Sequence, residues 1–498
     1  LDDTDSDIQV PNNINSFLWG QYVVPTEGGV WQKSNWQNIR NINYFMTHYQ
    51  SVQAAEADVN IYVAEMRFFR ALEYFNKIQL LGDVPWLEVD LNVDSEELYG
   101  PKMKRNQVFQ KIIEDLDFAI QWLPEAGSEE ANRLNKDIAR HVKARFCLNE
   151  GTHYKYHDEL EYASEAEKWL QMAATESDKL ITSGRYEIYN TGHPQEDYFN
   201  MYRIDDKSDL KEAVLYVDYK TNILEHNMAA AGREAGCGFS KSFVESFLCS
   251  DGLPISLSNK YLGDETMRKE TANRDPRLKQ LILTNDFPTN VTDDLKDSTF
   301  VVNEDEFITQ HCFTGYRPIK GFNPIYSQAL YMKSSFDGIA YRYAETLLIN
   351  AEAKAELNTI TNADLDRTVN QLRDRVGMPH LTVNVGFTDP KWPDWGYSLS
   401  PILQEIRRER CIELAGEGFR FNDLKRWKAG KVLNNVLTYV GKRKPDGNLA
   451  IVYPNYTNPD LSYQAGKSRT WEDKMYLYPI PTGELQRNPQ LLPQNPGW

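Results

Sequence analysis

Several groups of residues have the types that metal binding or phosphate binding requires. His153 and His157 are four positions apart, so on a helix they would share one face, as zinc ligands do. Tyr154 stands where a zinc peptidase motif carries its glutamate, so we interpret both histidines as surface or packing residues. The segment 465–469 (AGKSR) is similar to the end of a phosphate-binding loop, but the first glycine of that motif would fall at Leu461. We expect no nucleotide site there.

Acidic residues could act as general acids, general bases or calcium ligands. The chain has 72 of them, so carboxylate pairs suited to glycoside hydrolysis are expected by chance. Their presence does not indicate an enzyme unless the distance between the two carboxylates is known. Four aspartates crowd the start of the chain: Asp2, Asp3, Asp5 and Asp7. They lack the spacing and glycine of an EF-hand loop, so we expect a solvated linker and leave calcium binding open. The sequence predicts no catalytic residue, no metal site and no cofactor.

Three glutamates stand four residues apart in one predicted helix: Glu409, Glu413 and Glu417. Like charges at this spacing cost stability unless cations lie between them. Four arginines of the same segment are available: Arg407, Arg410, Arg420 and Arg426. We predict a buried or half-buried ion network, with catalytic carboxylates as the alternative interpretation.

Tryptophans on loops are the best candidates for ligand contact. A flat ring packs against the apolar face of a sugar while neighbouring polar groups bond its hydroxyls. Trp31 and Trp36 flank a polar turn, QKSN, just after two glycines, and Trp392 and Trp395 lie in the segment KWPDWGY. The alternative for each ring is a structural role, in which it packs its loop against the helical scaffold.

Helices must position most of these residues. Apolar side chains recur at helical spacing over residues 64–81, 106–123, 137–150 and 162–181, with Asn106 as a cap and Gly82 and Pro124 as stops. A later pair covers 340–355 and 362–376, the second capped by Asn362 and closed by Gly377. Small residues on the stripe over 340–355 favour close helix packing, as in stacked tetratricopeptide-like hairpins.

The chain divides into three expected regions: 1–184 helical, 185–337 irregular, and 338–498 helical with an extended tail. In the middle region Gly, Asn, Asp and Pro interrupt the chain, and only short stretches such as 214–218 predict strands. A long irregular stretch of this kind usually carries recognition. The prolines of the tail fix an extended path, which we expect to wrap the scaffold with Trp498 as its anchor.

Composition excludes several classes of protein. The net charge of −17 argues against nucleic acid, and no apolar run reaches the roughly twenty residues of a membrane helix. The five cysteines form no CxxC motif, so isolated buried thiols are the preferred interpretation. Pairing of Cys237 with Cys249 is left open.

Six segments together resemble the SusD/RagB family, in the order that the family has them. They are AEMRFFRALEYFNKIQLLGDVPWL (64–87), RNQVFQKIIEDLDFAIQWLP (105–124), RLNKDIARHVKARFCLNEG (133–151), YRYAETLLINAEAKAEL (341–357), IRRERCIELAGEGFRFNDLKRW (406–427) and YLYPIPTGELQRNPQLLPQNPGW (476–498). The fifth segment is the most specific. One match would be weak, whereas six in order are strong.

The resemblance implies an all-α fold, a tetratricopeptide-like scaffold of helical hairpins with a large loop-rich region. It also implies a non-enzymatic protein that binds an oligosaccharide or oligopeptide on the extracellular face of the outer membrane of Bacteroidota-type bacteria. The partner would be a SusC-like TonB-dependent channel. The family's lipidated cysteine has no counterpart before Cys147, so a lipid anchor is expected outside this chain.

Family members draw much of their binding site from the early loop and the irregular middle. The resemblance and the loop aromatics therefore give a set of expected ligand contacts: Trp31, Asn35, Trp36, Phe313 and Tyr316, followed by Trp392 and Trp395. Two other functions compete with this one. A secreted glycoside hydrolase would turn over its ligand, and a scaffold that binds only proteins would give no saccharide signal.

Overall fold

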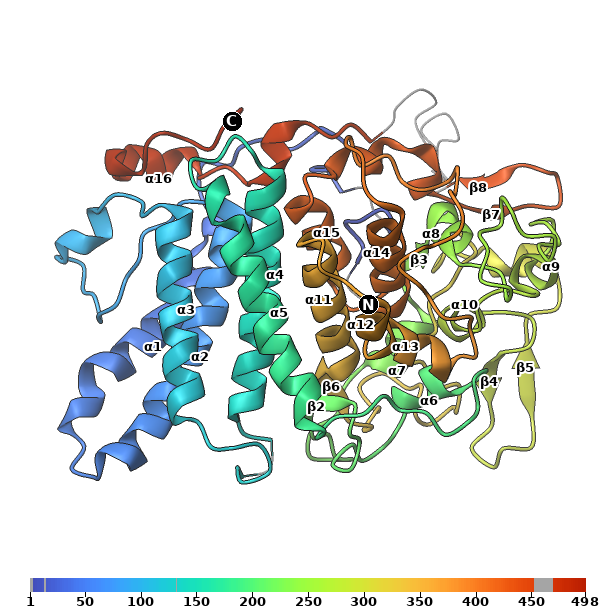
Figure 1. Ribbon diagram of the computed structural model, residues 1–498, viewed down its shortest axis with the longest axis horizontal. Coiled ribbons are helices and arrows are strands. Elements are labelled where there is room, and N and C mark those ends of the chain that lie inside the picture. Colours follow the sequence, from blue (N-terminus) through green and yellow to red (C-terminus); the bar gives the residue numbers. More distant parts are fainter. Residues whose placement is uncertain (1–2, 13–14, 131, 452–468) are drawn as a thin grey trace. The chain divides into compact units, whose positions relative to one another are not determined.

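The chain forms two compact units, and each unit is made of two segments that are separate in the sequence. The computed structural model describes residues 3–12, 15–130, 132–451 and 469–498 (Figure 1). One unit, the helical unit, comprises Gln21–Glu176 and Glu472–Trp498, and the other, the mixed unit, comprises Leu1–Gly20 and Ser177–Trp471. The expected middle region and most of the expected C-terminal region thus share one unit. Residues 465–468 of the AGKSR segment lie outside the described residues.

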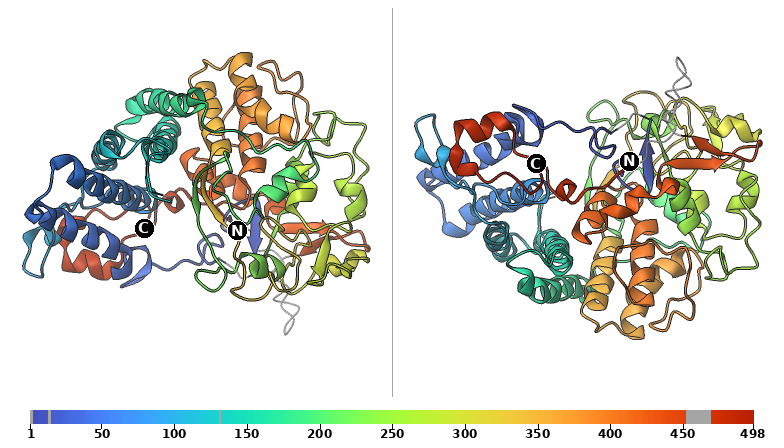
Figure 2. Two further views of the ribbon diagram at one scale, coloured as in Figure 1. Left: turned by 90° about the horizontal axis from the view of Figure 1, so that it is seen from below. Right: turned by 90° about the horizontal axis from the view of Figure 1, so that it is seen from above.

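The helical unit is built from antiparallel helices. Its elements are α1 (Gln37–His48), α2 (Glu56–Leu81), α3 (Arg105–Trp122), α4 (Lys136–Tyr156), the first part of α5 (Ala166–Ser183) and α16 (Thr482–Arg487). Helix α2 packs on α3 and α3 on α4, as Figures 1 and 2 show. Between them Phe75 stacks on Phe146 with ring centroids 3.6 Å apart, and Phe109 meets Trp169 edge-on at 4.8 Å. These aromatic contacts form the core of the predicted hairpins.

The predicted cap of α3 is wrong. Helix α3 begins at Arg105, so Asn106 lies inside its first turn and its side-chain amide donates to Glu165 at 3.0 Å. The backbone N–H of Arg105 is instead satisfied by Asp83 Oδ1 at 2.9 Å. The cap comes from the loop after α2, a contact that helix periodicity does not reveal.

The C-terminal tail wraps the helical unit, as predicted. The backbone N–H of Tyr478 donates to Leu80 O at 2.8 Å, and the Asn495 side chain donates to Leu81 O at 2.9 Å. Trp498 Nε1 donates to the carbonyl oxygens of Lys474 and Leu477, both at 2.9 Å. The bonds to Leu80 and Leu81 satisfy carbonyls at the C-terminal end of α2, and the two Trp498 bonds hold the end of the tail.

The mixed unit contains short elements in its first part and longer helices after them. Its helices are α6 (Asp197–Met201), α7 (Met228–Arg233), α8 (Lys241–Ser246), α9 (Met267–Thr271), α10 (Arg277–Leu281), α11 (Tyr343–Glu356), α12 (Asn362–Asp366), α13 (Val369–Arg375), α14 (Pro401–Glu413) and α15 (Arg420–Arg426). Helix α11 packs on α13 and α14. The predicted helix over 340–355 thus exists, starting at Tyr343.

The strands form separate two-stranded antiparallel sheets. The pairs are β1 (Gln9–Pro11) with β3 (Cys237–Phe239), β2 (Ala213–Val217) with β6 (Gly338–Arg342), β4 (Pro288–Val291) with β5 (Ser298–Phe300), and β7 (Val440–Arg443) with β8 (Leu449–Ile451). The strand predicted over 214–218 is confirmed as β2. A core of buried apolar residues, including Phe239, Phe243 and Phe247, lies among these short elements.

Two helices of the mixed unit differ from the sequence prediction. The predicted helix over 362–376 is divided into α12 and α13, and its cap is Thr361, whose hydroxyl accepts from the Asp364 N–H, in place of Asn362. Helix α14 ends at Glu413, and the chain then turns through Gly416 and Gly418, both with φ near +80°. Positive φ favours glycine, so this segment cannot continue the helix.

The cysteines are isolated. All five are free and buried, which confirms the preferred interpretation, and Cys237 accepts a hydrogen bond from Gln9 without pairing with Cys249. Within the described ranges, the helices all lack the combination of length and hydropathy that spanning a bilayer requires.

Candidate functional site

Trp31 and Trp36 lie side by side at the start of α1 and, with the turn between them, form what we call the Trp31–Trp36 surface (residues 31–36). Gly28 and Gly29 have φ of 82° and 55°, and this turn leads into two short 3-10 helices, Gly29–Trp31 and Lys33–Trp36. The two ring centroids are 5.1 Å apart with planes tilted by 60°. Both rings are half-buried. The two rings thus lie next to each other, beside the polar turn that they flank, and their contact with a ligand stays a prediction.

Polar groups surround the two rings. Asn35 donates its side-chain amide to Val30 O at 3.0 Å, which closes the turn, while Gln32, Lys33 and Ser34 are exposed. No described residue accepts a hydrogen bond from Trp36 Nε1. The surface thus offers aromatic faces and exposed polar side chains within one turn.

Trp392 and Trp395 occupy a different position, in the mixed unit. Trp392 Nε1 donates to Glu405 Oε1 at 2.8 Å, and Trp395 Nε1 donates to Gln404 Oε1 at 2.6 Å. Both rings line a cavity of about 640 Å³, within the size range of ligand pockets. Trp395 is only 4% exposed and packs edge-on against Trp427.

Phe313 and Tyr316 pack inside the mixed unit. Phe313 belongs to a small cluster with Val10 and Tyr439. Tyr316 has no exposed surface, and its hydroxyl donates to Glu270 at 2.8 Å. Burial raises the pKa of Tyr316 well above its ordinary value. In this structure Tyr316 is a core residue and presents no atom to solvent, although it lies in a loop-rich region.

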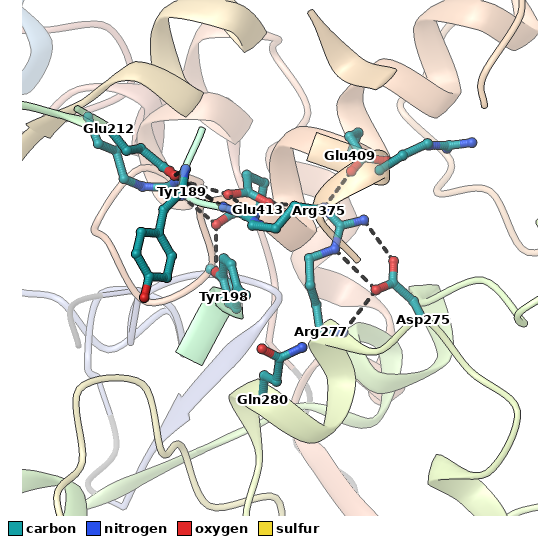
Figure 3. Close-up of polar contacts among 12 residues, drawn as sticks. Tyr189, Tyr198, Glu212, Asp275, Arg277, Gln280, Arg375, Glu409 and Glu413 are labelled. Atoms are coloured by element: carbon teal, nitrogen blue, oxygen red, sulfur yellow. Dashed lines mark hydrogen bonds and ion pairs between the residues drawn. The ribbon is translucent and has the colours of Figure 1, made fainter. Parts of the chain in front are cut away.

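Glu413 is the centre of a buried ion network (Figure 3). Arg277 of α10, Arg342 of β6 and Arg375 of α13 donate to its carboxylate at 3.0, 2.7 and 2.6 Å. Glu413 and Arg375 are completely buried. Burial by itself raises the pKa of Glu413, but Arg375, Arg342 and Arg277 outweigh it and hold this pKa well below its usual range.

The predicted ion network is confirmed, but its predicted geometry is wrong. Glu417 lies after the end of α14, and its cations are Arg342 and Lys320. The arginines of the segment pair elsewhere: Arg407 with Glu356, Arg410 with Asp423, Arg420 with Asp7, and Arg426 with Glu352. The glutamates point toward elements distant in sequence, so helix spacing could not identify their partners.

The aspartates at the start of the chain are partly buried, which corrects the expectation of a solvated linker. Asp3 accepts the backbone N–H groups of Gly416 and Arg420 at 2.7 and 2.9 Å. Asp7 binds the Arg420 guanidinium through two hydrogen bonds of 2.7 and 2.8 Å. The turn after α14 leaves backbone N–H groups that the Asp3 carboxylate satisfies. Asp2 lies outside the described residues.

His153 and His157 are packing residues. Both are buried, with ring centroids 4.1 Å apart, and the His157 ring meets Tyr476 at 4.9 Å. Among residues 3–12, 15–130, 132–451 and 469–498, no group of three or more histidine, cysteine or acidic side chains could hold a metal ion.

Sequence reasoning missed the polar lining of the cavity beside Trp392. Arg420, Lys431 and Asn434 line it together with Asp7. The sequence predicts Arg420 only as a member of the ion network, because it belongs to the signature segment. Lys431 and Asn434 belong to no motif. Their placement depends on the path of the chain after α15 and carries no local signal.

Comparison with known proteins identifies the relatives of this chain. The model of the SusD family matches residues 181–498. SusD-like protein P2 from Formosa agariphila is 24% identical over 456 residues, which cover 89% of this chain and 75% of that protein.

Solved structures share the whole fold. A SusD-like carbohydrate binding protein from Bacteroides fragilis has a TM-score of 0.73 at 21% identity, covering 98% of this chain and 92% of that chain. Surface glycan-binding protein A from Bacteroides fluxus has a TM-score of 0.62 at 17% identity, covering 100% of this chain and 92% of that chain. The predicted helical fold of the SusD type is thereby confirmed. Since the family model matches more than half of its length, the chain belongs to the SusD family.

Proposed function

We propose that this protein binds a glycan at the bacterial cell surface and delivers it to a TonB-dependent channel of the outer membrane. The observation that carries the proposal is the Trp31–Trp36 surface on a chain of the SusD family. Two structural relatives are named for binding carbohydrate or glycan, and a third for binding laminarin. These names support the ligand class.

The geometry of the Trp31–Trp36 surface suits a sugar chain. Rings tilted by 60° form a bent wall that contacts a pyranose from two sides. Both rings are half-buried, so part of each aromatic face is available to a ligand. The exposed amide of Gln32 and hydroxyl of Ser34 stand within the same turn.

Catalysis is no part of the proposed function. The signature carboxylates Glu409 and Glu413 are buried and paired with arginines, an arrangement that stabilises structure and leaves no room for a substrate. A secreted glycoside hydrolase is the competing function. Sustained release of reducing sugar by the purified chain, not removed by further purification, would establish that competitor.

The binding test uses affinity electrophoresis in gels that contain laminarin or xyloglucan. Wild-type protein should be retarded by at least one neutral polysaccharide. The double variant Trp31→Ala/Trp36→Ala should lose at least about tenfold in affinity, which corresponds to roughly 1.4 kcal/mol. Its melting temperature should remain close to that of the wild type.

The control variant is Tyr44→Ala, which removes an exposed aromatic ring of α1 outside the surface. It should bind as the wild type does. Unaltered affinity of the double variant would move the site elsewhere, and a collapse of its stability would show that the two rings pack the loop. Binding of peptides alone, or of no saccharide in a broad screen, would contradict the proposal.

A further inference from the structure

The cavity beside Trp392 is built from distant parts of the mixed unit. Its walls come from residues 7–8, 242–246 and 389–396 and from several positions within 404–438. Trp392 and Trp395 form its aromatic wall. Their indole N–H groups are bonded to Glu405 and Gln404, so both rings are held in place.

Arg420 lines this cavity and carries a buried donor without a partner among the described residues. It is 5% exposed, and its Nε and Nη2 atoms bind the two oxygens of Asp7 side-on. In the part of the chain that the structure describes, Nη1 has no hydrogen-bond partner. A buried donor without a partner costs about 1–3 kcal/mol, so an acceptor atom in the cavity would stabilise the protein.

The buried charges around the cavity are paired. Asp7 binds Arg420, Asp389 binds Arg408 at 2.6 Å and Glu245 binds Lys391 at 2.8 Å. Arg407 also lines the cavity and binds Glu356, a residue outside the lining, at 3.0 Å. Lys431 and Asp394 are exposed at the cavity and carry opposite charges. A lining with both charges favours a ligand without net charge. An anion would be repelled by the carboxylates, and a cation would be repelled by the guanidinium groups.

We infer that this cavity is a second ligand site, which binds the neutral, hydroxyl-rich end of a saccharide. One ring of the ligand packs against Trp392 and Trp395, and a hydroxyl or ring oxygen accepts from Arg420 Nη1. Lys431 and Asp394 bond further hydroxyls at the opening. The inference rests on the proposed glycan-binding function but uses a site separate from the Trp31–Trp36 surface.

The test follows Trp392 by fluorine NMR in protein labelled with 5-fluorotryptophan. The Trp392 resonance is assigned by its loss in Trp392→Phe. The probes are three neutral disaccharides, laminaribiose, cellobiose and mannobiose, with digalacturonic acid as the charged counterpart. At least one neutral probe should shift the Trp392 resonance in a saturable way, and digalacturonic acid should not.

Arg420→Lys tests the donor. A lysine retains a positive charge beside Asp7 but lacks Nη1, so the dissociation constant of the active disaccharide should rise at least about tenfold. Arg70→Lys is the matched control, since Arg70 binds Asp115 side-on through Nε and Nη2, both at 2.7 Å, and is equally buried. It should bind the disaccharide as the wild type does.

Lys431→Ala provides a variant that leaves the buried pair intact. Because Lys431 is exposed, its loss should spare the melting temperature and weaken disaccharide binding several-fold. Binding that is unchanged in both Arg420→Lys and Lys431→Ala would overturn the inference, as would a response to digalacturonic acid alone.

Failure of this inference can be distinguished from failure of the proposed function. If gels with polysaccharide retard the wild type but no disaccharide shifts Trp392, the second site is refuted and the proposed function stands. A crystal structure with ordered water on Arg420 Nη1 after soaking with each disaccharide would refute it in the same way. If a disaccharide shifts Trp392 while no polysaccharide is retained, the second site stands and the role of the Trp31–Trp36 surface is refuted.

Discussion

At the scale of single residues, burial determines how much each charged group contributes to the stability of the fold. Glu413 is completely buried, and three guanidiniums meet its two oxygens. Asp275, Glu212 and Glu417 bind the same arginines and compensate the remaining positive charge. Breaking a buried ion pair by removing one partner leaves the remaining charges uncompensated, which costs more than the pair itself contributes.

Glu413→Gln should therefore destabilise the protein strongly. The amide removes the negative charge that three arginines share, and we expect the free energy of unfolding to fall by about 3–5 kcal/mol. Urea denaturation followed by circular dichroism measures the change. In Arg375→Met/Glu413→Gln the loss should be smaller than the sum of the two single losses, because the residues contact each other. A loss below about 1 kcal/mol for Glu413→Gln would contradict this account.

Asp3 should make stability depend on pH in the opposite direction to an ordinary salt-bridged aspartate. Burial raises the pKa of Asp3 from 3.8 to about 6, despite hydrogen bonds from the Arg420 and Gly416 N–H groups. The folded protein therefore holds this proton more tightly than the unfolded chain does. Its contribution to stability is present below about pH 4 and is lost as the pH rises through about 6, at most roughly 3 kcal/mol.

The measurement compares the wild type with Asp3→Asn in urea at several pH values from 4 to 7. The asparagine does not titrate, so the stability of the wild type relative to the variant should decrease as the pH rises. Asp94→Asn, an exposed substitution, controls for the loss of one negative charge. Curves for wild type and Asp3→Asn that stay parallel would show that Asp3 does not titrate in this range.

At the scale of elements, glycines decide where helices approach and where they end. Gly151 lies inside α4, and a Cβ at this position would come within 2.9 Å of both Cγ and the backbone N of Leu170 in α5. Gly416 and Gly418 end α14 by adopting positive φ. The first glycine permits close packing of two helices, and the other two redirect the chain toward Asp3.

Gly151→Ala should destabilise the helical unit although alanine favours helix formation. The gain in helix propensity is about 1 kcal/mol, but the added methyl group collides with the backbone of α5, and overpacking costs typically 1–3 kcal/mol. A lower melting temperature is expected. Lys155→Ala, an exposed change on the same helix, should leave it nearly unchanged. A melting temperature raised by Gly151→Ala would mean that α5 moves aside freely.

At the scale of the whole molecule, the proposed function requires a partner. Membership of the SusD family supports a stable complex with a TonB-dependent channel. Purification of the tagged chain from native membranes in gentle detergent should recover the channel, which mass spectrometry identifies.

The double variant Trp31→Ala/Trp36→Ala serves as the control for this complex. It should retain the channel while losing the glycan, since the ring pair is proposed to contact only the ligand. Isolation of the channel free of this chain from wild-type membranes would contradict the proposed complex.

The sequence alone determined the features that depend on local spacing. Helical periodicity located α2, α3, α4, α5 and α11, and ordered signature segments indicated the SusD family. Glycine stops were predicted where φ is positive, as at Gly82 and Gly377. The proximity of Trp31 and Trp36 also follows from the sequence, because only four residues of tight turn separate them.

Only the tertiary structure decided which side chains meet across the chain. The partners of Glu413 come from α10, β6 and α13, and Asp7 finds Arg420 at the far end of the sequence. Burial of Tyr316 and the cavity beside Trp392 arise in the same way. Helix propensity and turns depend on neighbouring residues, whereas ion pairs, burial and cavities depend on packing between segments that no local pattern relates.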